Sequence, residues 1–308
     1  MKVVREALAR RLDRLPAETS CFRWVDEELP GVTVDLFGDV AVLSLYRSAS
    51  EEEERALAEA LANARTLRAV YVKRRPREAR TSGQRVEEAA PPAPLWGSAV
   101  ESLVCEELGA KFEIRPANGL SVGLYLDARD ARAWVRANAR GRTVLNTFAY
   151  ACGFGVVARL GGASRAVNVD VSRKVLDWGE RNLALNGFTP QRADFLSGDA
   201  FEWFGRLAKK GQRFDVVVLD PPGFATTKVS RFSAQKDYHR LVAAAAGVVD
   251  EGVVLAMCNV EALSPADVVA HLKRGLAGRR FQVVERFGAS AIDFRQPSTL
   301  KCLVVEVR

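Results

Sequence analysis

The first third of the chain alternates between short strand-like and helix-like patterns. Residues 31–46, GVTVDLFGDVAVLSLY, alternate apolar and polar positions, break at a Gly-Asp pair and then become strongly apolar, which is typical of a β-hairpin. A helix over about 51–64 and a strand at the start of residues 67–80 are expected to follow. The segment 89–96, AAPPAPLW, is the best candidate for a linker. We therefore expect a small α+β domain over residues 1–95, with binding of an RNA substrate as its expected role.

From about Thr143 the pattern changes to strands and helices in alternation. The segments TVLNTF, RAVNVD, ADFLSG, FDVVVLD and GVVLAMCN predict strands, and the helix between the second and third begins after Ser172 and ends at Gly187. This alternation predicts a Rossmann-like, doubly wound, mostly parallel α/β sheet. The last two apolar segments, RRFQVVERFG and LKCLVVEV, have no convincing helix between them and predict an antiparallel C-terminal hairpin at the sheet edge. The second domain is expected to span residues 96–308, with 96–142 as a lead-in segment.

Composition narrows the class of protein and its partners. Lys and Arg number 45 against 38 Asp and Glu, and the net charge of +7 favours a polyanionic partner, with nucleic acid as the leading class. The five cysteines are scattered and lack C-x-x-C spacing, so neither a disulfide framework nor a metal site is expected. This cysteine usage predicts a location in a reducing cytoplasm. No apolar run approaches the roughly 18 residues of a membrane span. The oligomeric state stays open, with a homodimer as one candidate.

The segment RFDVVVLDPPGFATTK places a carboxylate at the end of a predicted buried strand. Residues 216–219 are apolar without alternation, as expected for a central parallel strand covered on both faces. Open α/β sheets bind ligands beyond the carboxyl ends of their strands, and prolines there fix the chain direction. Asp220 and Pro221 are therefore candidate catalytic residues, and Phe224 either stacks on a base or packs under the loop.

A second candidate site follows the first strand of the sheet, in NTFAYACGFGVVARLGG. Gly153 and Gly155 could let a ligand approach the backbone, and Asp170 at the next strand end could accept hydrogen bonds from a ribose. This pattern leaves two cofactors open, a nicotinamide dinucleotide and S-adenosylmethionine. Asp199 in SGDAF, placed for an adenine amino group, favours the second. A hydride-transfer acid is hard to place, because the chain has only two histidines and His271 is expected on a solvated helix.

Five segments together resemble bacterial large-subunit ribosomal RNA methyltransferases, the group that contains cytosine-C5 and guanine-N7 enzymes. The segments are LPGVTVDLFGD, GLYLDARDAR, VLNTFAYACGFGVVARLGGA, NVDVSRKVLDWGERNLALNG and FDVVVLDPPGF. The resemblance implies an S-adenosylmethionine-dependent enzyme that acts on ribosomal RNA, at cytosine C5 or a guanine nitrogen. It implies a cofactor site bordered by Tyr125, Asp127, Arg129, Asn146, Phe148, Gly153, Gly155, Asp170, Asp199 and Asp220.

Two features depart from the cytosine-C5 enzymes of that group. Those enzymes begin with an additional RNA-binding domain, and this sequence starts at the domain that follows it. Methylation at C5 also needs a thiolate that adds to C6, and Cys258 in LAMCNVEAL is the candidate nucleophile. The gapless match, however, places the cysteine of the family motif on Asn259, and the guanine enzymes carry asparagines there. Cys258 is therefore either a nucleophile or a buried cysteine.

Basic residues near two predicted strand ends are candidate RNA contacts. Six side chains are proposed to meet RNA: Lys73, Arg74, Arg75, Phe224, Lys228 and Arg231. Two alternatives from other classes remain open, a nicotinamide-dependent oxidoreductase and a non-catalytic RNA-binding protein that retains a cofactor pocket.

Overall fold

The computed structural model describes residues 2–75, 86–226 and 231–308 and divides into two compact units. The first unit comprises Met1–Leu126 with Ser290–Gln296, and the second comprises Asp127–Ala289 with Pro297–Arg308. The chain therefore passes from one unit to the other three times.

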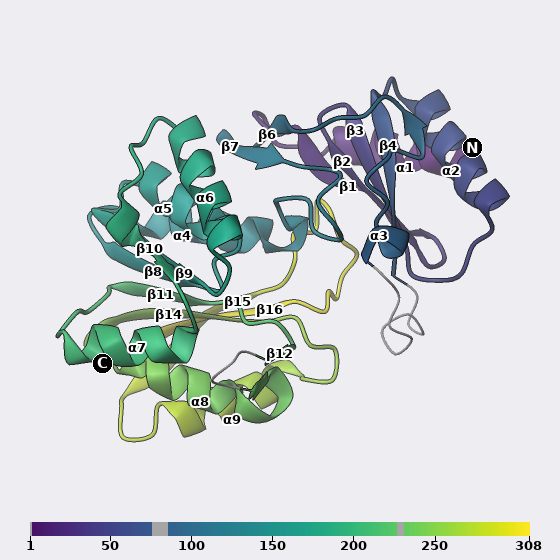
Figure 1. Ribbon diagram of the computed structural model, residues 1–308. Coiled ribbons are helices and arrows are strands. Elements are labelled where there is room, and N and C mark those ends of the chain that lie inside the picture. Colours follow the sequence, from purple (N-terminus) through teal and green to yellow (C-terminus); the bar gives the residue numbers. More distant parts are fainter. Residues whose placement is uncertain (1, 76–85, 227–230) are drawn as a thin grey trace. The chain divides into compact units, whose positions relative to one another are not determined.

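The first unit is built on a mixed sheet with the order β1-β2-β3-β4-β5 (Figure 1). Antiparallel pairs join β1 to β2 and β2 to β3, whereas β3 and β4 are parallel and are connected by helix α2. The hairpin and helix expected from the sequence are confirmed. The bounds are α1 Lys2–Leu12, β1 Cys21–Leu29, β2 Val32–Phe37, β3 Val40–Leu45, α2 Glu51–Ala64, β4 Ala69–Arg74, α3 Val86–Ala89 and β5 Trp96–Gly97.

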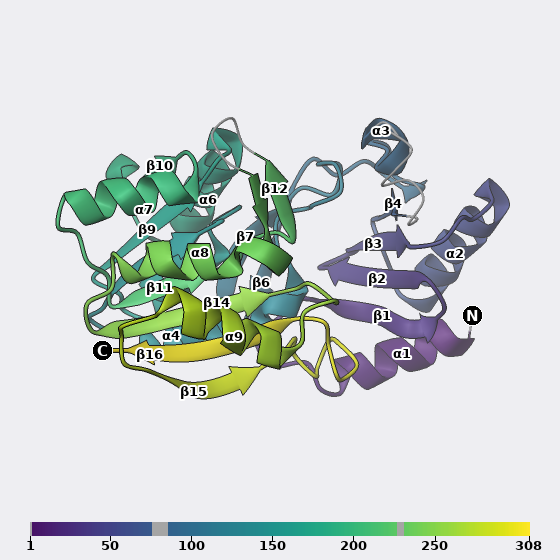
Figure 2. The ribbon, with the colours of Figure 1, turned by 90° about the horizontal axis from the view of Figure 1, so that it is seen from below.

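One face of this sheet carries the main core of the first unit. The α1 residues Val4 and Leu8 and the α2 residue Leu61 belong to one buried cluster with Trp24, whose indole N–H donates to the Val4 carbonyl at 2.9 Å. Helices α1 and α2 also contact each other and lie beside this sheet in both views (Figure 2). Two amphipathic helices thus cover the buried face of the sheet, as the alternating burial along β2 indicates.

The boundary between the units lies about thirty residues later than the sequence predicts. The segment 89–96 is not a linker, because Trp96 pairs with Val70 and adds a strand to the first sheet. Residues 98–126 stay with the same unit through the hairpin of β6 Leu103–Glu107 and β7 Ala110–Ile114. A backbone hydrogen bond from Ser20 to Glu106 ties that hairpin to β1. Long-range backbone pairing of this kind leaves no local signal in the sequence.

Residues 290–296 return from the C-terminal part of the chain to the first unit. Asp293 is fully buried and accepts the backbone N–H of Arg23 at 2.9 Å, while the Arg23 guanidinium lies 4.6 Å from the ring centroid of Phe294. The backbone N–H of Arg295 donates to Asp26 at 2.9 Å. These contacts make the segment part of the first unit.

The second unit is a three-layer α/β domain. Its sheet has the order β10-β9-β8-β11-β14-β16-β15, in which the first five strands are parallel and β16 and β15 are antiparallel. This confirms the doubly wound sheet with an antiparallel C-terminal hairpin. The strands are β8 Thr143–Thr147, β9 Arg165–Asp170, β10 Phe195–Ser197, β11 Val216–Leu219, β14 Gly252–Cys258, β15 Phe281–Phe287 and β16 Lys301–Val307.

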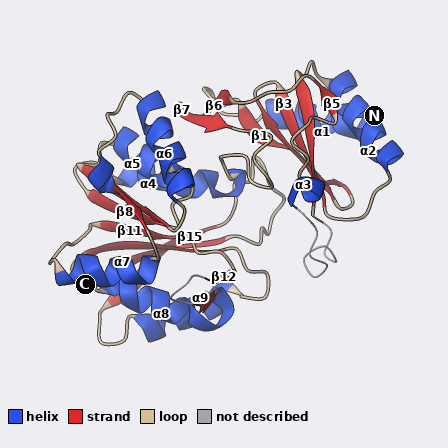
Figure 3. Ribbon diagram, in the orientation of Figure 1, coloured by secondary structure: helices blue, strands red, loops and turns tan. Residues whose placement is uncertain are grey.

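Helices cover both faces of this sheet. Helices α4, α5 and α6 lie on one face, and α7, α8 and α9 lie on the other (Figures 1 and 3). Because β8, β9, β11 and β14 are parallel, their carboxyl ends lie at the same edge of the sheet. The remaining bounds are α4 Arg129–Asn138, α5 Gly153–Leu160, α6 Arg173–Leu185, α7 Ala200–Lys209, β12 Phe224–Thr226, β13 Arg231–Ser233, α8 Ala234–Ala246 and α9 Pro265–Gly275.

None of the helices described is long and apolar enough to cross a membrane. Within the same part of the chain, no group of three or more His, Cys, Asp and Glu side chains is arranged to hold a metal ion.

Candidate active site

A strained loop follows β8 at the carboxyl edge of the second sheet. Phe148, Tyr150 and Cys152 have positive φ angles of 56°, 48° and 60°, a conformation that costs about 1–3 kcal/mol for each residue other than glycine. Helix α6 holds this loop in two ways. The buried Asn182 amide donates to the Ala151 carbonyl at 2.9 Å, and a Cβ atom at Gly179 would lie 2.2 Å from the Cys152 sulfur. Such strain is typical of ligand-binding loops that the surrounding structure fixes.

Gly155 is needed for the packing of a helix on a strand, and it stays a predicted cofactor contact. A Cβ atom at this position would lie 2.2 Å from Oδ1 of Asn168 in β9. The same Asn168 oxygen accepts a hydrogen bond from Asn146 at 2.9 Å, and Asn146 is only 1% exposed. Asn146 is thus held in the core by its bond to β9, and its contact with the cofactor stays a prediction. Gly153, at the start of α5, stays a predicted cofactor contact.

Asp170 ends β9 with a carboxylate that organises the loop. Its two oxygens accept the backbone N–H groups of Tyr150 and Ser172, each at 2.9 Å. Burial nevertheless raises the pKa of Asp170. The next residue, Val171, is 60% exposed, so an apolar surface lies beside the carboxylate. A carboxylate next to an exposed apolar side chain suits a ribose and the flat face of a purine.

Two other predicted cofactor contacts have structural partners of their own. Asp199 is 7% exposed and caps helix α7, where its carboxylate accepts the Phe201 N–H at 2.8 Å. The ring of Phe148 lies 6.5 Å from that of Phe232 and packs against the core. Both remain predictions as cofactor contacts.

Asp220 lies at the end of β11, where the Pro-Pro-Gly corner begins. Burial and the nearby Asp127 carboxylate raise the pKa of Asp220 to about 7, and Arg132 opposes this shift. A Cβ atom at Gly223 would approach Val260 to 3.2 Å, so the corner packs closely against the residues that follow β14. A partly protonated carboxyl group at a strand end is typical of sites that transfer or bind protons.

Asp127 and Asn259 are joined by a hydrogen bond at the same edge. The Asn259 amide donates to Asp127 at 3.1 Å, and its oxygen accepts the hydroxyl of Thr299 at 2.7 Å. An ionised carboxylate only accepts hydrogen bonds, so these contacts fix the orientation of the amide. The carboxylates of Asp127 and Asp220 and the amide of Asn259 thereby form one polar cluster.

The surroundings of Cys258 favour the buried cysteine over the nucleophile, the two alternatives left open by the sequence. Its side chain is 1% exposed and belongs to the hydrophobic core under the sheet. Burial raises the pKa of the Cys258 thiol. A hydrogen bond with the backbone of Val260 and the charge of Lys301 offset this rise only in part. A thiolate nucleophile needs the opposite environment, with access to substrate and a lowered pKa.

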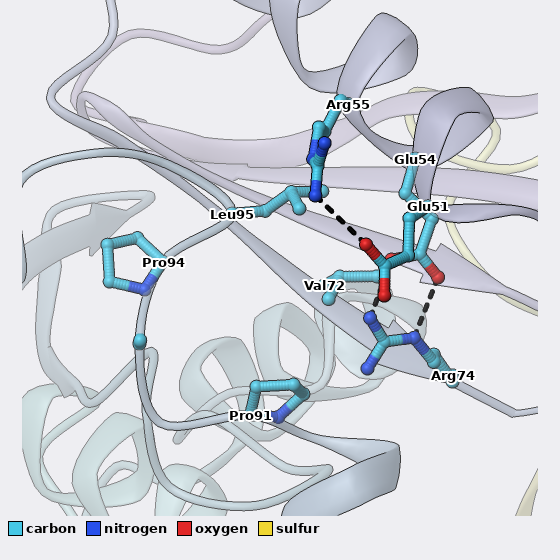
Figure 4. A pocket seen from close by; sticks show the side chains of 9 residues that line it. Glu51, Glu54, Arg55, Val72, Arg74, Pro91, Pro94 and Leu95 are labelled. Carbon is cyan, nitrogen blue, oxygen red and sulfur yellow. Dashed lines mark hydrogen bonds and ion pairs between the residues drawn. The ribbon is translucent and has the colours of Figure 1, made fainter.

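Lys73 and its neighbours are largely occupied inside the first unit. Lys73 is fully buried and donates to the Pro116 carbonyl at 2.7 Å, which corrects its expected contact with RNA. Arg74 makes two hydrogen bonds to the buried Glu54, at 2.7 and 2.6 Å. Figure 4 shows this pair beside a pocket of about 250 Å³. Arg75 donates to the Leu120 carbonyl. Arg74 and Arg75 are thus engaged by the protein itself.

The other predicted site residues differ in exposure. Phe224 is 67% exposed and Arg231 is exposed, whereas Lys228 lies outside the described residues. Tyr125 is 51% exposed and shares a hydrogen bond with Ser121, and Arg129 is 1% exposed at the start of α4. The expectation that His271 is solvated is wrong, because the side chain is 8% exposed and accepts a hydrogen bond from the His239 backbone at 3.2 Å.

Comparison with known proteins places this geometry in a family. Residues 17–304 match the model of the S-adenosylmethionine-dependent methyltransferases. The chain belongs to this family. It is 32% identical over 267 residues to ribosomal RNA large subunit methyltransferase I of Escherichia coli strain SMS-3-5, a match that covers 85% of this chain and 66% of that protein. The chain thus spans about two thirds of that relative's length.

Solved structures share the methyltransferase fold. A protein of Streptococcus mutans assigned as an S-adenosylmethionine-dependent methyltransferase has a TM-score of 0.87 at 21% identity, covering 99% of this chain and 80% of that one. The tRNA m1G37 methyltransferase of Methanocaldococcus jannaschii has a TM-score of 0.62 at 14% identity, covering 92% and 76%. Family membership decides between the two candidate cofactors in favour of S-adenosylmethionine, and the nicotinamide alternative is dropped.

The methyltransferase's own residues fit this cofactor. The strained loop at 148–152, the Asp170 carboxylate and the exposed Val171 lie at adjoining strand ends, as a nucleoside requires. When bound, S-adenosylmethionine supplies a methyl group already activated by a sulfonium. The protein then has to bind and orient the cofactor and the acceptor and to exclude water. Positioning of this kind lowers the activation barrier by up to roughly 7–11 kcal/mol.

Three residues of the methyltransferase site were missed by sequence reasoning. Gly179 and Asn182 support the strained loop from α6, and Thr299 holds Asn259 from the segment just before β16. A glycine inside a predicted helix was the one available signal, since it often marks a close approach of another backbone. Thr299 gives no comparable signal, because its partner is 40 residues away.

Proposed function

We propose that this methyltransferase modifies a base in RNA, with large-subunit ribosomal RNA as the substrate. The observation that carries the proposal is the position of Asp220, which directly follows β11 near Asp127 and starts a rigid Pro-Pro-Gly corner. A planar base held against this corner would meet a carboxyl group and a closely packed backbone rather than water.

The choice of ribosomal RNA rests on the relatives. Ribosomal RNA large subunit methyltransferase I matches most of this chain, and the net charge of +7 suits a polyanionic substrate. The exposed Phe224 ring follows the Asp220 corner, where stacking on a base taken out of its helix would contribute about 1–3 kcal/mol. A ribosomal RNA substrate also supports a cytoplasmic location.

Transfer of a labelled methyl group from S-adenosylmethionine tests the proposal. The acceptors are unmodified large-subunit ribosomal RNA, small-subunit ribosomal RNA and bulk tRNA, each at the same nucleotide concentration. We expect incorporation into the large-subunit RNA alone, and a loss of at least about tenfold in kcat with Asp220→Ala that exceeds any loss of cofactor affinity. Incorporation only into tRNA would show that tRNA, and not ribosomal RNA, is the substrate. Binding of RNA with no transfer to any acceptor would indicate a non-catalytic RNA-binding protein.

A further inference from the structure

We infer that Asn259 and Asp220 together bind the edge of a nucleobase that carries an N–H group, and that the methyl group is transferred to this nitrogen. The inference rests on the proposed function and deepens it, because it selects a class of target atom. It also makes Asn259 a residue that determines specificity, at the position where a cytosine-C5 enzyme needs its thiolate.

The first step of the argument is the missing nucleophile at the carboxyl end of β14. Carbon 5 of a pyrimidine becomes nucleophilic only after a thiolate adds to carbon 6. Cys258 is 1% exposed inside the core, and burial raises the pKa of its thiol. The other described cysteines are buried as well, namely Cys21, Cys105, Cys152 and Cys302. Among the described residues, therefore, no cysteine offers an accessible thiolate.

The second step is the way in which Asn259 is held. Asn259 is exposed at the strand end, yet its amide is fixed from both sides by Asp127 at 3.1 Å and Thr299 at 2.7 Å. An amide nitrogen carries two N–H groups, and the contact with Asp127 uses one of them. The second can donate to a ring nitrogen or carbonyl oxygen of a base. An exposed amide held in one orientation is suited to reading a base edge.

The third step is the carboxyl group next to this amide. Asp127 contacts Asn259 and acts electrostatically on Asp220, and Gly223 of the Asp220 corner packs against Val260, the residue after Asn259. These contacts bring an N–H donor and a carboxylate acceptor to one edge of the sheet. The matching ligand presents an acceptor beside an N–H group, as the pairing edges of guanine, adenine and cytosine do. The C5 edge of a pyrimidine presents neither.

The chemistry balances without a covalent intermediate. The lone pair of the base nitrogen forms the new bond to the methyl carbon as the bond from that carbon to sulfur breaks. The electron pair of the broken bond stays on sulfur, which becomes a neutral thioether. The nitrogen gains a positive charge and loses its proton to the Asp220 carboxylate, from which the proton passes to water. The proposed step therefore needs no oxidant, reductant or cysteine.

Two substitutions and one product analysis test the inference. The RNA product of the unaltered protein is digested, and the labelled nucleoside is identified by mass spectrometry. We expect a nucleoside methylated at a nitrogen that carried a hydrogen before transfer, which excludes 7-methylguanosine. We also expect Cys258→Ala to keep kcat/KM within about threefold of the unaltered protein, and Asn259→Ala to lose about 10- to 100-fold at unchanged affinity for S-adenosylhomocysteine. Thr299→Val, which removes one of the two hydrogen bonds that orient Asn259, is expected to give a smaller loss.

The opposite results overturn the inference. A 5-methylpyrimidine product, a loss of transfer in Cys258→Ala, or a covalent adduct with RNA that contains 5-fluorocytidine would each assign the reaction to carbon 5. If the protein transfers no methyl group to any RNA, the proposed function fails. The inference is then decided by titrating nucleoside monophosphates into the protein loaded with S-adenosylhomocysteine. Binding that Asn259→Ala weakens supports it, and binding that this variant leaves unchanged, or no binding, refutes it.

Discussion

Gly155 of helix α5 and Asn168 of strand β9 are packed so closely that a Cβ atom on the glycine would lie 2.2 Å from the asparagine Oδ1. The Asn168 side chain is buried and accepts a hydrogen bond from Asn146, so it cannot turn away without leaving the Asn146 amide without an acceptor. The tight contact fixes where α5 begins, and with it the strained loop that α5 follows. The second glycine of the segment CGFGVVA, Gly155, is therefore required by packing.

Replacement of Gly155 by alanine should destabilise the protein by about 1–3 kcal/mol, the usual effect of overpacking. Denaturant unfolding followed by circular dichroism measures the change. Gly205 is the matched control, because it lies in α7 with no heavy atom within 4 Å of its would-be Cβ. Gly205→Ala should stabilise the protein by up to about 1 kcal/mol through helix propensity. Equal effects of the two substitutions would contradict the packing argument.

Removal of one Asp170 oxygen should weaken cofactor binding. In the unaltered protein the two Asp170 oxygens accept the backbone N–H groups of Tyr150 and Ser172. Asp170→Asn keeps only one oxygen, so one of these N–H groups loses its acceptor. We expect affinity for S-adenosylhomocysteine to fall at least about tenfold, the equivalent of one charge-assisted hydrogen bond, as measured by calorimetry. Asp194→Asn is the control, since Asp194 pairs with Arg165 at the other end of β9. Unchanged affinity in Asp170→Asn would remove Asp170 from the cofactor site.

Asp220 should make the folded state less stable as the pH rises. Burial raises its pKa in the folded protein to about 7, so between about pH 4 and 7 the carboxyl is ionised in the unfolded chain but protonated in the folded one. Stability is therefore greatest below this window and falls across it, by at most about 4 kcal/mol. The groups that interact with Asp220 in this region are Asp127, Arg132, Tyr238, Cys258 and Cys302.

Asp220→Asn isolates this contribution. The difference in unfolding free energy between the variant and the unaltered protein should be near zero at pH 4, grow in favour of the variant up to about pH 7 and then stay constant. Asp215→Asn is the control at the opposite end of β11, where Asp215 accepts hydrogen bonds from Thr143. A difference that does not vary with pH would show that Asp220 has an ordinary pKa.

Local sequence patterns anticipated the second unit well, because its strands and helices are decided by neighbouring residues. Ser172 and Gly187 bracket α6 as predicted, and the Gly187 φ of 83° explains why a glycine ends that helix. The boundary after Leu126 and the role of Asp293 depend on contacts between distant segments, which a local pattern does not record. Burial of Lys73 was missed for a similar reason, since its partner is the Pro116 carbonyl, 43 residues away.

The difference between Lys73 and Arg231 gives a final prediction about RNA. Lys73 is fully buried in the first unit, whereas Arg231 is exposed at the start of β13 in the second. Arg231→Ala should weaken RNA binding and reduce the slope of log affinity against log salt by about 1, because one phosphate contact is lost. Lys73→Met should leave the slope unchanged, since no phosphate reaches its amine. Filter binding at several salt concentrations measures both, with circular dichroism to confirm that each variant folds. A reduced slope in Lys73→Met would mean that β4 opens when RNA binds, and an unchanged slope in Arg231→Ala would move the RNA contact away from β13.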